Sequence, residues 1–517
     1  MEVEAVWVII LGVTLLAGIL SGLPVMFVIS GVPVLIAFLA HAFGHFDVSY
    51  FQAVPQRIFG VMENRLLIAV PLFVMMGVLL DRSRQAEFML TNINRLFGGS
   101  RTGLALSVLF ISTLIAASTG IIGATIVALG AISLPSLTKA GVDDRTASGL
   151  ICASGTLGQI IPPSIVLILL GDQVSNAYIE AQQTIGNFAP DSVTIGDLFA
   201  GALFPGLLLV LLYGAFVVFR LRGQSGNAAG KPAGHGEIGA VLRGVLPTLL
   251  LIFAVLGSIL FGVATPTEAA SIGVAGTILV AAAQVSPSSA KSAALTGVLA
   301  LAMLVSSVTG LLQVDFTTGQ VAFTASTLLT VALILLLIAG LAWHGLVLAR
   351  AAILLPALVE TLVVSGMIFG IIIAASILSL VFRGFGGDEM VAELLAHVPG
   401  GPYGLLAATM LVIFLLGFIL EFVEIIFIVV PIVGPVILQA DINPVWFAVL
   451  IAMNLQTSFL TPPFGFALFY FRSVAPSRIR TVAIYRAVFP FVIIQMIAIL
   501  CLATFPALAT WLPGQLF

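Results

Sequence analysis

Residues 155–164 read GTLGQIIPPS and place two consecutive prolines inside a long apolar stretch. Proline has no N–H to donate and its ring clashes with the preceding turn, so a helix that reaches Pro162 and Pro163 has to unwind there. Residues 455–465, LQTSFLTPPFG, repeat this arrangement near the other end of the chain. Unwound backbone in an apolar environment is tolerated only where it is buried in protein or lines a polar cavity. We therefore predict two broken helices with breaks inside the protein.

The composition places these helices in a membrane. Of the 517 residues, 60% are hydrophobic and only 8% are charged, against about a quarter charged residues in soluble domains. The apolar runs are long enough to cross a bilayer and do not alternate as β-barrel strands do, so we predict an all-α polytopic membrane protein. The net charge of −3 excludes a nucleic-acid binder. The sequence has no P-loop motif, which argues against direct ATP coupling.

The segment 103–138 is apolar, yet basic residues stand on both sides of it. These are Arg82, Arg84, Arg95 and Arg101 before the segment and Lys139 and Arg145 after it. Positively charged loops stay in the cytoplasm, so both ends of the segment are expected on that side. Each arm has about 15 residues, or about 22 Å of helix, which is too short to cross about 30 Å of hydrocarbon. We predict a re-entrant helical hairpin.

A second hairpin is expected over residues 405–438, entering from the opposite side of the membrane. Its tip lies near Glu421 and Glu424. Each predicted hairpin is followed by one of the broken helices, so the unit occurs twice in opposite orientations. Such an inverted repeat is typical of secondary transporters, whose substrate and coupling ions bind where the repeats meet.

The unwound backbone predicts the chemistry of that meeting point. Free carbonyls and hydroxyls suit a hard cation such as sodium, and half-helix N-termini suit an anionic group of a substrate. The predicted sodium ligands are Thr119, Ile121, Gly158, Ile161 and Pro163 in one cage and Glu421, Thr457, Ser458, Thr461 and Pro463 in the other. The predicted substrate contacts are Ser118, Gln159, Ser164, Gln456 and Thr457. Neither break contains Arg or Lys, so a bound carboxylate would depend on amides, helix dipoles, the sodium ions or an arginine from elsewhere in the chain.

The two glutamates of the second tip admit several interpretations. A carboxylate inside a membrane is costly and usually functional, which favours Glu421 as an ion ligand or proton relay. The alternatives are a tip that reaches water or a carboxylate that caps the returning helix. An intramembrane enzyme using Glu421 and Glu424 is the rival class of protein, but no His or Ser stands near them in the sequence. We expect neither enzymatic activity nor a cofactor other than sodium.

Four stretches together resemble the large membrane subunit of the tripartite ATP-independent periplasmic (TRAP) transporters. They are ENRLLIAVPLF at 63–73, CASGTLGQIIPPS at 152–164, ATPTEAA at 264–270 and NLQTSFLTPPFG at 454–465. The wording is most similar to the branch labelled mannitol/chloroaromatic compound transport. The resemblance implies a sodium-driven elevator in the bacterial inner membrane, with a separate small four-helix membrane subunit and a periplasmic binding protein that delivers an organic acid. A carrier of the same fold that works without a binding protein is the alternative.

The resemblance also implies a division of the chain into a transport domain and a scaffold. The predicted segments are 1–102 (N-terminal scaffold helices), 103–171 (first hairpin and broken helix), 172–390 (scaffold and arm helices), 391–470 (second hairpin and broken helix) and 471–517 (C-terminal helix). The third segment includes a cytoplasmic linker at 221–240 and an extra helix pair at 291–349. The residues 5–43 are compatible with one kinked helix or with two helices, because Gly22 and Pro24 follow the first apolar run.

Overall fold

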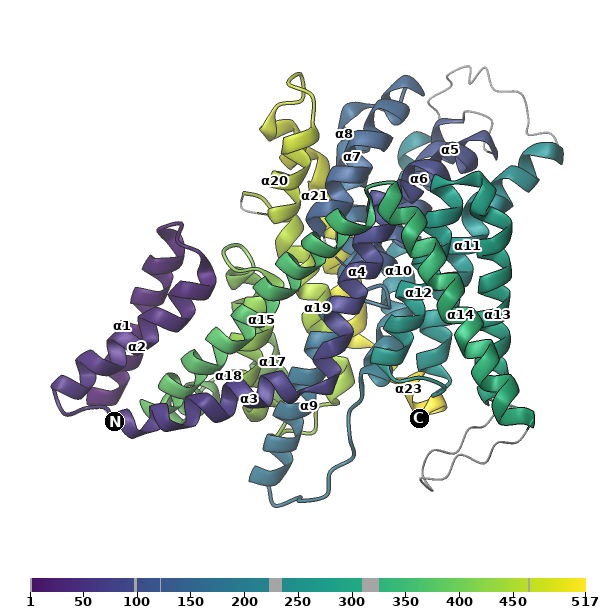
Figure 1. Ribbon diagram of the computed structural model, residues 1–517. Helices are drawn as coiled ribbons and strands as arrows, with labels where there is room; N and C mark the ends of the chain where they lie inside the picture. Colours follow the sequence, from purple (N-terminus) through teal and green to yellow (C-terminus); the bar gives the residue numbers. More distant parts are fainter. Residues whose placement is uncertain (1, 97–99, 121, 223–234, 309–324, 464) are drawn as a thin grey trace.

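The computed structural model describes residues 2–96, 100–120, 122–222, 235–308, 325–463 and 465–517 (Figure 1). Regular structure in these ranges is entirely helical. Eight of the described helices are long and apolar enough to cross a membrane, or nine if α3 and α4 form one bent span. The predicted all-α, multi-pass class is thereby confirmed.

The helices of both predicted hairpin-plus-broken-helix units are present. The arms of the first hairpin have 19 and 18 residues and are longer than predicted, and its return arm is one of the eight helices long enough to cross a membrane. The first comprises α6 (Arg101–Thr119), α7 (Ile122–Lys139), α8 (Asp144–Gly155), η3 (Thr156–Gln159) and α9 (Ile165–Thr184). The second comprises α17 (Gly401–Leu416), α18 (Phe422–Ile437), α19 (Pro444–Leu460) and α20 (Phe466–Val474). Figure 1 shows α7 and α8 in the upper half of the molecule and α17 and α18 in the lower half. The two hairpins therefore enter the fold from opposite ends.

Packing between the units follows an approximate two-fold relation. The return arm α7 packs against α20 of the other unit, and its counterpart α18 packs against α9. The helix that follows each unit obeys the same rule: α21 (Thr481–Thr504) packs against α8, and α10 (Ile195–Leu221) packs against α19. We call this set, α6–α10 with α17–α22, the hairpin body; α22 spans Ala507–Thr510. The inverted repeat predicted from the paired prolines is thus visible as exchanged contacts.

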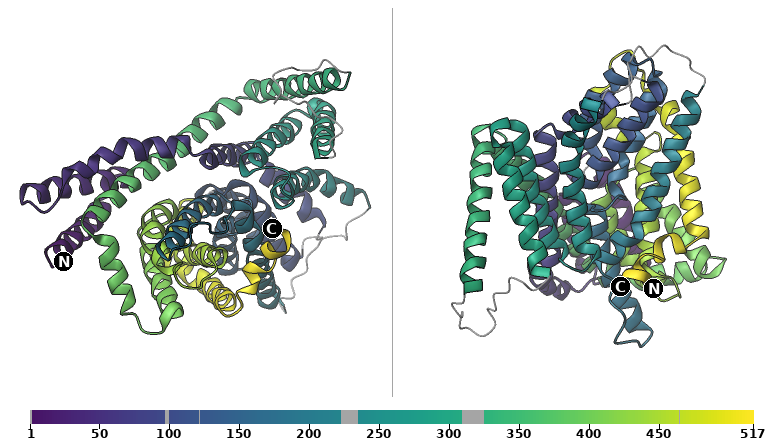
Figure 2. Two further views of the ribbon diagram at one scale, coloured as in Figure 1. Left: turned by 90° about the horizontal axis from the view of Figure 1, so that it is seen from below. Right: turned by 90° about the vertical axis from the view of Figure 1, so that its right-hand side faces the viewer.

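Long helices lie along one side of the hairpin body, as the left view in Figure 2 shows. We call α1–α4 and α11–α15 the outer row. Its members are α1 (Glu2–Leu20), α2 (Val25–Ala42), α3 (Val54–Glu63), α4 (Ala69–Arg82), α11 (His235–Leu260), α12 (Pro266–Val285), α13 (Ala290–Val308), α14 (Ala325–Arg350) and α15 (Leu354–Gly384). Within the row, α12 packs against α4 and α15 packs against α2. Short elements complete the described chain: η1 (Val48–Ala53), η2 (Arg65–Ile68), α5 (Gln85–Leu96), η4 (Pro287–Ser289), α16 (Gly387–Ala396) and α23 (Pro513–Leu516).

Several boundaries differ from those expected. Residues 5–43 form two packed helices, because Gly22 adopts a φ of +81° that turns the chain back on itself. The helix α9 continues to Thr184, beyond position 171 at which the segment of the first broken helix was expected to end. Most of the predicted linker 221–240 lies outside the described residues, and α13 and α14 occupy the region of the extra helix pair.

One ion pair shows that two predicted cytoplasmic loops lie at the same end. Arg478, between α20 and α21, approaches Asp144 at the start of α8 with an Nε–Oδ2 distance of 3.2 Å. The neighbouring sequence also carries Lys139 at the end of α7, Arg145 in the first turn of α8 and Arg480 just before α21. Their clustering agrees with the orientation predicted from the positively charged loops.

Candidate transport site

Each broken helix ends where its proline pair removes hydrogen-bond donors. In a helix, the carbonyl of residue i accepts from the N–H of residue i+4, so Pro162 and Pro163 leave the carbonyls of Gly158 and Gln159 without helical donors. The Ser164 hydroxyl partly replaces the missing donors, because it donates to the Gln159 carbonyl at 3.1 Å. By the same argument, Pro462 and Pro463 remove the helical donors of the Ser458 and Phe459 carbonyls. Both Pro-Pro peptide bonds are cis.

The tip of each hairpin lies against the break of its own unit. In the first unit, Gly120 turns the chain between α6 and α7 with a φ of +60°, and a Cβ built there would lie 3.3 Å from the Ile165 nitrogen. A Cβ on Gly158 would lie 3.2 Å from the Ala116 carbonyl oxygen. In the second unit, a Cβ on Gly417 would overlap the Ser458 hydroxyl. Glycines thus allow backbone to approach backbone at the first break and allow the Ser458 side chain to approach the tip at the second.

The two breaks meet at equivalent positions of the repeat. Gln456 donates from Nε2 to the Thr156 hydroxyl at 3.2 Å, and the two residues are 300 positions apart. The proline pairs at 162–163 and 462–463 have the same separation. The hydrogen bond therefore crosses the pseudo-two-fold axis, and Gln495 of α21 approaches the same hydroxyl at 3.5 Å. This contact brings together the two sites that the sequence predicted to be neighbours.

The predicted ligands of the first cage lie at this junction where they are described. Gly158, Ile161 and Pro163 are buried around the first break. Ile121 and the side chains of Ser118 and Thr119 lie outside the described residues.

In the second predicted cage, the side-chain hydroxyl groups already donate hydrogen bonds to carbonyls of their own helix. Thr457 and Ser458 are fully buried and donate to the carbonyls of Met453 and Leu455 at 2.9 and 2.8 Å. Thr461 donates to the Thr457 carbonyl at 2.7 Å. Pro463 is exposed, and its carbonyl accepts from the Tyr485 hydroxyl at 3.1 Å. The hydroxyl oxygens retain lone pairs for a cation, but their protons are already used.

The second tip shows that Glu424 has a structural role. Glu421 is the N-cap residue of α18, and its backbone N–H donates to the Glu424 carboxylate. Glu424 is 3% exposed, whereas Glu421 is half-buried. This is the capping arrangement among the alternatives considered above, and the Glu421 side chain takes part in it by accepting from the Glu424 backbone.

The predicted substrate contacts are more deeply buried than the sequence suggested. Gln159, Ser164, Gln456 and Thr457 each have no exposed surface. The Gln159 amide has no hydrogen-bond partner among the described residues, although it is fully buried. Buried polar groups are nearly always satisfied in native proteins, so an unpaired amide next to a break marks a place where water or a ligand completes the structure.

Sequence reasoning missed two residues next to this junction. Tyr470 of α20 is 36% exposed, and a Cβ on Gly123, close to the first hairpin tip, would lie 2.8 Å from its ring. The helix α20 packs against α7, so Tyr470 lies beside the first hairpin. Gln495 of α21 approaches the axis from outside both predicted units. The only local signal for Gln495 is a lone polar residue in an apolar helix.

Paired hairpins over paired breaks, related by an inverted repeat, define a membrane transporter. The sequence matches the family described as the DctM component of the tripartite ATP-independent periplasmic transporters over residues 12–285 and 281–508. The chain belongs to this family and is a TRAP transporter large permease component. The family works with a small membrane subunit and a periplasmic binding protein, and it is not a family of enzymes.

Individual relatives agree with this assignment. The chain is 24% identical to the C4-dicarboxylate TRAP transporter large permease protein DctM of Vibrio cholerae, over 94% of this chain and 95% of that protein. It is also 24% identical to the ectoine TRAP transporter large permease protein TeaC of Halomonas elongata, over 98% of each chain. Among solved structures, the YdaH transporter of Alcanivorax borkumensis is similar in fold, with a TM-score of 0.55, 13% identity and coverage of 90% of this chain and 89% of that one.

Proposed function

We propose that this permease couples the entry of sodium to the uptake of a small organic acid across the bacterial inner membrane. A periplasmic binding protein delivers the substrate, and a separate small four-helix subunit supports the permease. The observation that carries the proposal is the junction of the two breaks at Thr156 and Gln456, with a hairpin tip over each break. Within the described residues, no group of three or more His, Cys, Asp or Glu side chains forms a metal site. A cation bound at the junction would therefore depend mainly on carbonyl and hydroxyl oxygens, which suits sodium.

The substrate site is proposed on the exposed side of the junction. Residues 159, 164, 456 and 457 are fully buried, so a substrate that reaches them has to part the hairpin tips. Glu421, Thr461 and Tyr470 are partly exposed near the tips and are the first side chains that an entering molecule meets. The N-terminus of α9 at Ile165 lies beside the first tip, and its positive dipole end favours a carboxylate.

The movement proposed for transport is a sliding of the hairpin body along the outer row. The two breaks, their tips and the helices α10 and α21 pack on one another as a unit, so the whole site can move without being taken apart. This is the elevator mechanism that the resemblance implied.

We propose the chemical class of the substrate, a small molecule that carries a carboxylate, and not its identity. Relatives of equal identity are named for C4-dicarboxylates and for ectoine, two molecules that each carry a carboxylate. The assignment to the mannitol/chloroaromatic branch remains a proposal about the subfamily of this chain. We expect the partner binding protein to select the substrate.

The test is uptake by proteoliposomes that contain the permease and its small subunit, with the binding protein outside. Succinate, as a C4-dicarboxylate, and ectoine are the first labelled probes. Uptake is expected with an inward sodium gradient and should disappear when choline replaces sodium. Uptake that continues unchanged in choline would overturn the sodium coupling. Uptake that needs sodium but not the binding protein would favour the binding-protein-independent carrier.

A further inference from the structure

One face of α9 carries three polar residues spaced by four. Asp172, Asn176 and Glu180 stand at i, i+4 and i+8, so they lie along the same side of the helix. The helix belongs to the hairpin body, but it also packs against α4 of the outer row and against the short element η2 that precedes α4. Its counterpart α20 packs against α7, α8, α19 and α21 of the hairpin body. The polar face of α9 is therefore a contact surface between the two groups of helices.

Asp172 makes the first contact across this surface. The Asn64 side chain donates from Nδ2 to the Asp172 carboxylate at 2.9 Å. Asn64 is held in place because its Oδ1 accepts from the Leu66 N–H at 3.0 Å and caps η2. Asp172 is 7% exposed, and its other oxygen accepts from Gln173 at 2.8 Å. A buried carboxylate left without its donors would be costly, so this contact is worth more than a surface hydrogen bond.

Glu180 makes the second contact, two turns further along α9. Arg383, in the last turn of α15, approaches the Glu180 carboxylate at 3.0 Å. The same guanidinium contacts Asp388 of α16 at 3.1 Å. The guanidinium of Arg383 is thus oriented by Asp388 of the following helix while it binds Glu180 of the hairpin body.

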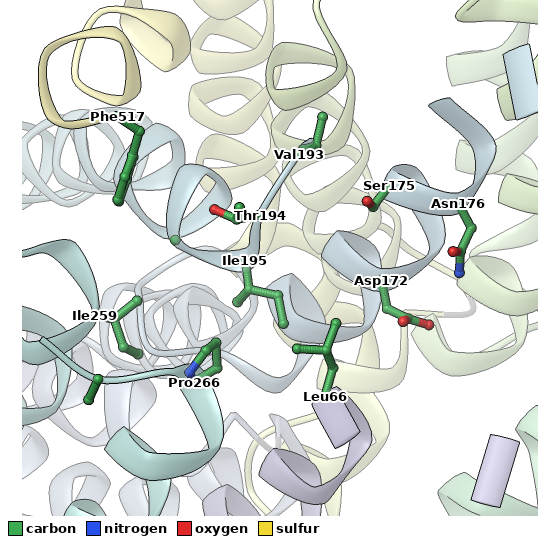
Figure 3. A pocket seen from close by; sticks show the side chains of 12 residues that line it. Leu66, Asp172, Ser175, Asn176, Val193, Thr194, Ile195, Ile259, Pro266 and Phe517 are labelled. Atoms are coloured by element: carbon green, nitrogen blue, oxygen red, sulfur yellow. The ribbon is translucent and has the colours of Figure 1, made fainter. Parts of the chain in front are cut away.

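The surface between these groups is incompletely packed. A cavity of about 310 Å³ lies beside Asp172 and is lined from both sides, as Figure 3 shows. Leu66, Ile259 and Pro266 line one wall, and Asp172, Asn176 and Ile195 line the other. Close packing would hold two bodies together through many small contacts. Such packing joins α15 to α18 and α4 to α6 elsewhere between the two groups, whereas the polar contact of Asp172 lies next to an open space.

We propose that Asn64–Asp172 and Arg383–Glu180 form a two-point latch, which holds the hairpin body in its present position and has to open in each transport cycle. The inference rests on the proposed sliding of the hairpin body. Directional polar contacts suit this role because they break within a short displacement. Opening the latch also exposes the buried Asp172 carboxylate to water, which compensates for the partner that it loses, and the Glu180 carboxylate is already partly exposed.

The test is a distance measurement between the two bodies. Spin labels on Gln56→Cys in α3 and Asp191→Cys in the α9–α10 loop, both exposed positions, report the position of the hairpin body by electron paramagnetic resonance. Cys501→Ser removes the partly exposed native thiol. The labelled permease is reconstituted with its small subunit in lipid, with sodium and with choline.

The latch is removed by Asp172→Leu combined with Glu180→Gln. We expect the population at the second distance, relative to the population at the first, to rise about tenfold or more. Most of this rise comes from the buried hydrogen bond to Asp172, and the partly exposed Arg383–Glu180 ion pair adds less. Asp144→Asn and Glu360→Gln are matched controls. They break the ion pairs Arg478–Asp144 at 3.2 Å and Arg82–Glu360 at 2.7 Å, which lie within the hairpin body and within the outer row.

The three possible outcomes distinguish the latch from the sliding movement. A shift in the double variant and not in the controls supports the latch. An unchanged ratio in the double variant, while the parent protein shows two distances, overturns the latch and leaves the sliding intact. A single distance in every variant, with sodium and with choline, overturns both the latch and the proposed sliding.

Discussion

Gly417 is expected to be intolerant of even one methyl group, because the second hairpin tip lies directly on α19. A Cβ on Gly417 would overlap the Ser458 hydroxyl and lie 2.7 Å from the Ser458 Cβ. Ordinary carbon contacts are about 3.5–4.0 Å, so the hairpin or the helix has to move by about 1 Å. Ser458 cannot rotate away freely, since it is fully buried and its hydroxyl donates to the Leu455 carbonyl at 2.8 Å.

The magnitude follows from these contacts. Overpacking of this kind costs about 1–3 kcal/mol. It is partly offset by about 0.4–1 kcal/mol, because Gly417 has a φ of −64° that alanine adopts without strain and alanine lowers the entropy of the unfolded chain. Ser458→Gly should remove the overlap, so Gly417→Ala should cost less in that background than in the parent protein. We expect a favourable coupling of at least about 1 kcal/mol between the two changes, as neighbouring sites commonly show.

The assay is thermal unfolding of the purified permease with its small subunit, followed with and without sodium. The matched control is Gly214→Ala in α10, where a Cβ would meet its nearest atom at 3.6 Å, an ordinary contact. Gly417→Ala should unfold at a lower temperature than the control and gain less stability from sodium. Equal unfolding temperatures for Gly417→Ala, the control and the parent protein would refute the close approach of the tip to the break.

Two further predictions concern the junction and the first hairpin. Thr156→Val should destabilise the permease by about 1–3 kcal/mol, because it leaves the Gln456 and Gln495 amides without their shared acceptor; thermal unfolding measures this, and a variant as stable as the parent would show that the junction is not held by this hydroxyl. Gly123→Ala should reduce uptake severalfold, because the methyl meets the Tyr470 ring at 2.8 Å, and adding Tyr470→Ala should relieve the overlap and restore the sodium-dependent stabilisation. A double variant no better than Gly123→Ala in that stabilisation would contradict the contact.

Local chemistry made the hairpins and breaks predictable. The proline pairs stop a helix wherever they occur, and short apolar arms between basic loops imply a turn inside the membrane. The first hairpin was predicted over 103–138 and is formed by Arg101–Thr119 and Ile122–Lys139. The capping role of Glu424 was also readable, because an acidic residue three positions after the N-cap is a known helix-start pattern.

Contacts between distant parts of the chain could not be predicted from the local sequence. The hydrogen bond from Gln456 to Thr156 joins residues 300 positions apart, and Gln495 reaches the same hydroxyl from a third helix. Nothing local distinguishes these glutamines from polar residues that line a substrate path, which is why Gln456 was predicted to contact substrate. The latch residues depended equally on tertiary structure, since Asp172 lies just beyond the predicted segment 103–171 and is buried within α9.

The most direct test of sodium-coupled transport follows both solutes in the same proteoliposomes. Radioactive sodium and the labelled substrate are measured together, with the binding protein present or omitted. Sodium coupling predicts that substrate and sodium enter together, and that omitting either the binding protein or the substrate stops the coupled sodium entry. Accumulation of the substrate with no accompanying sodium would contradict it.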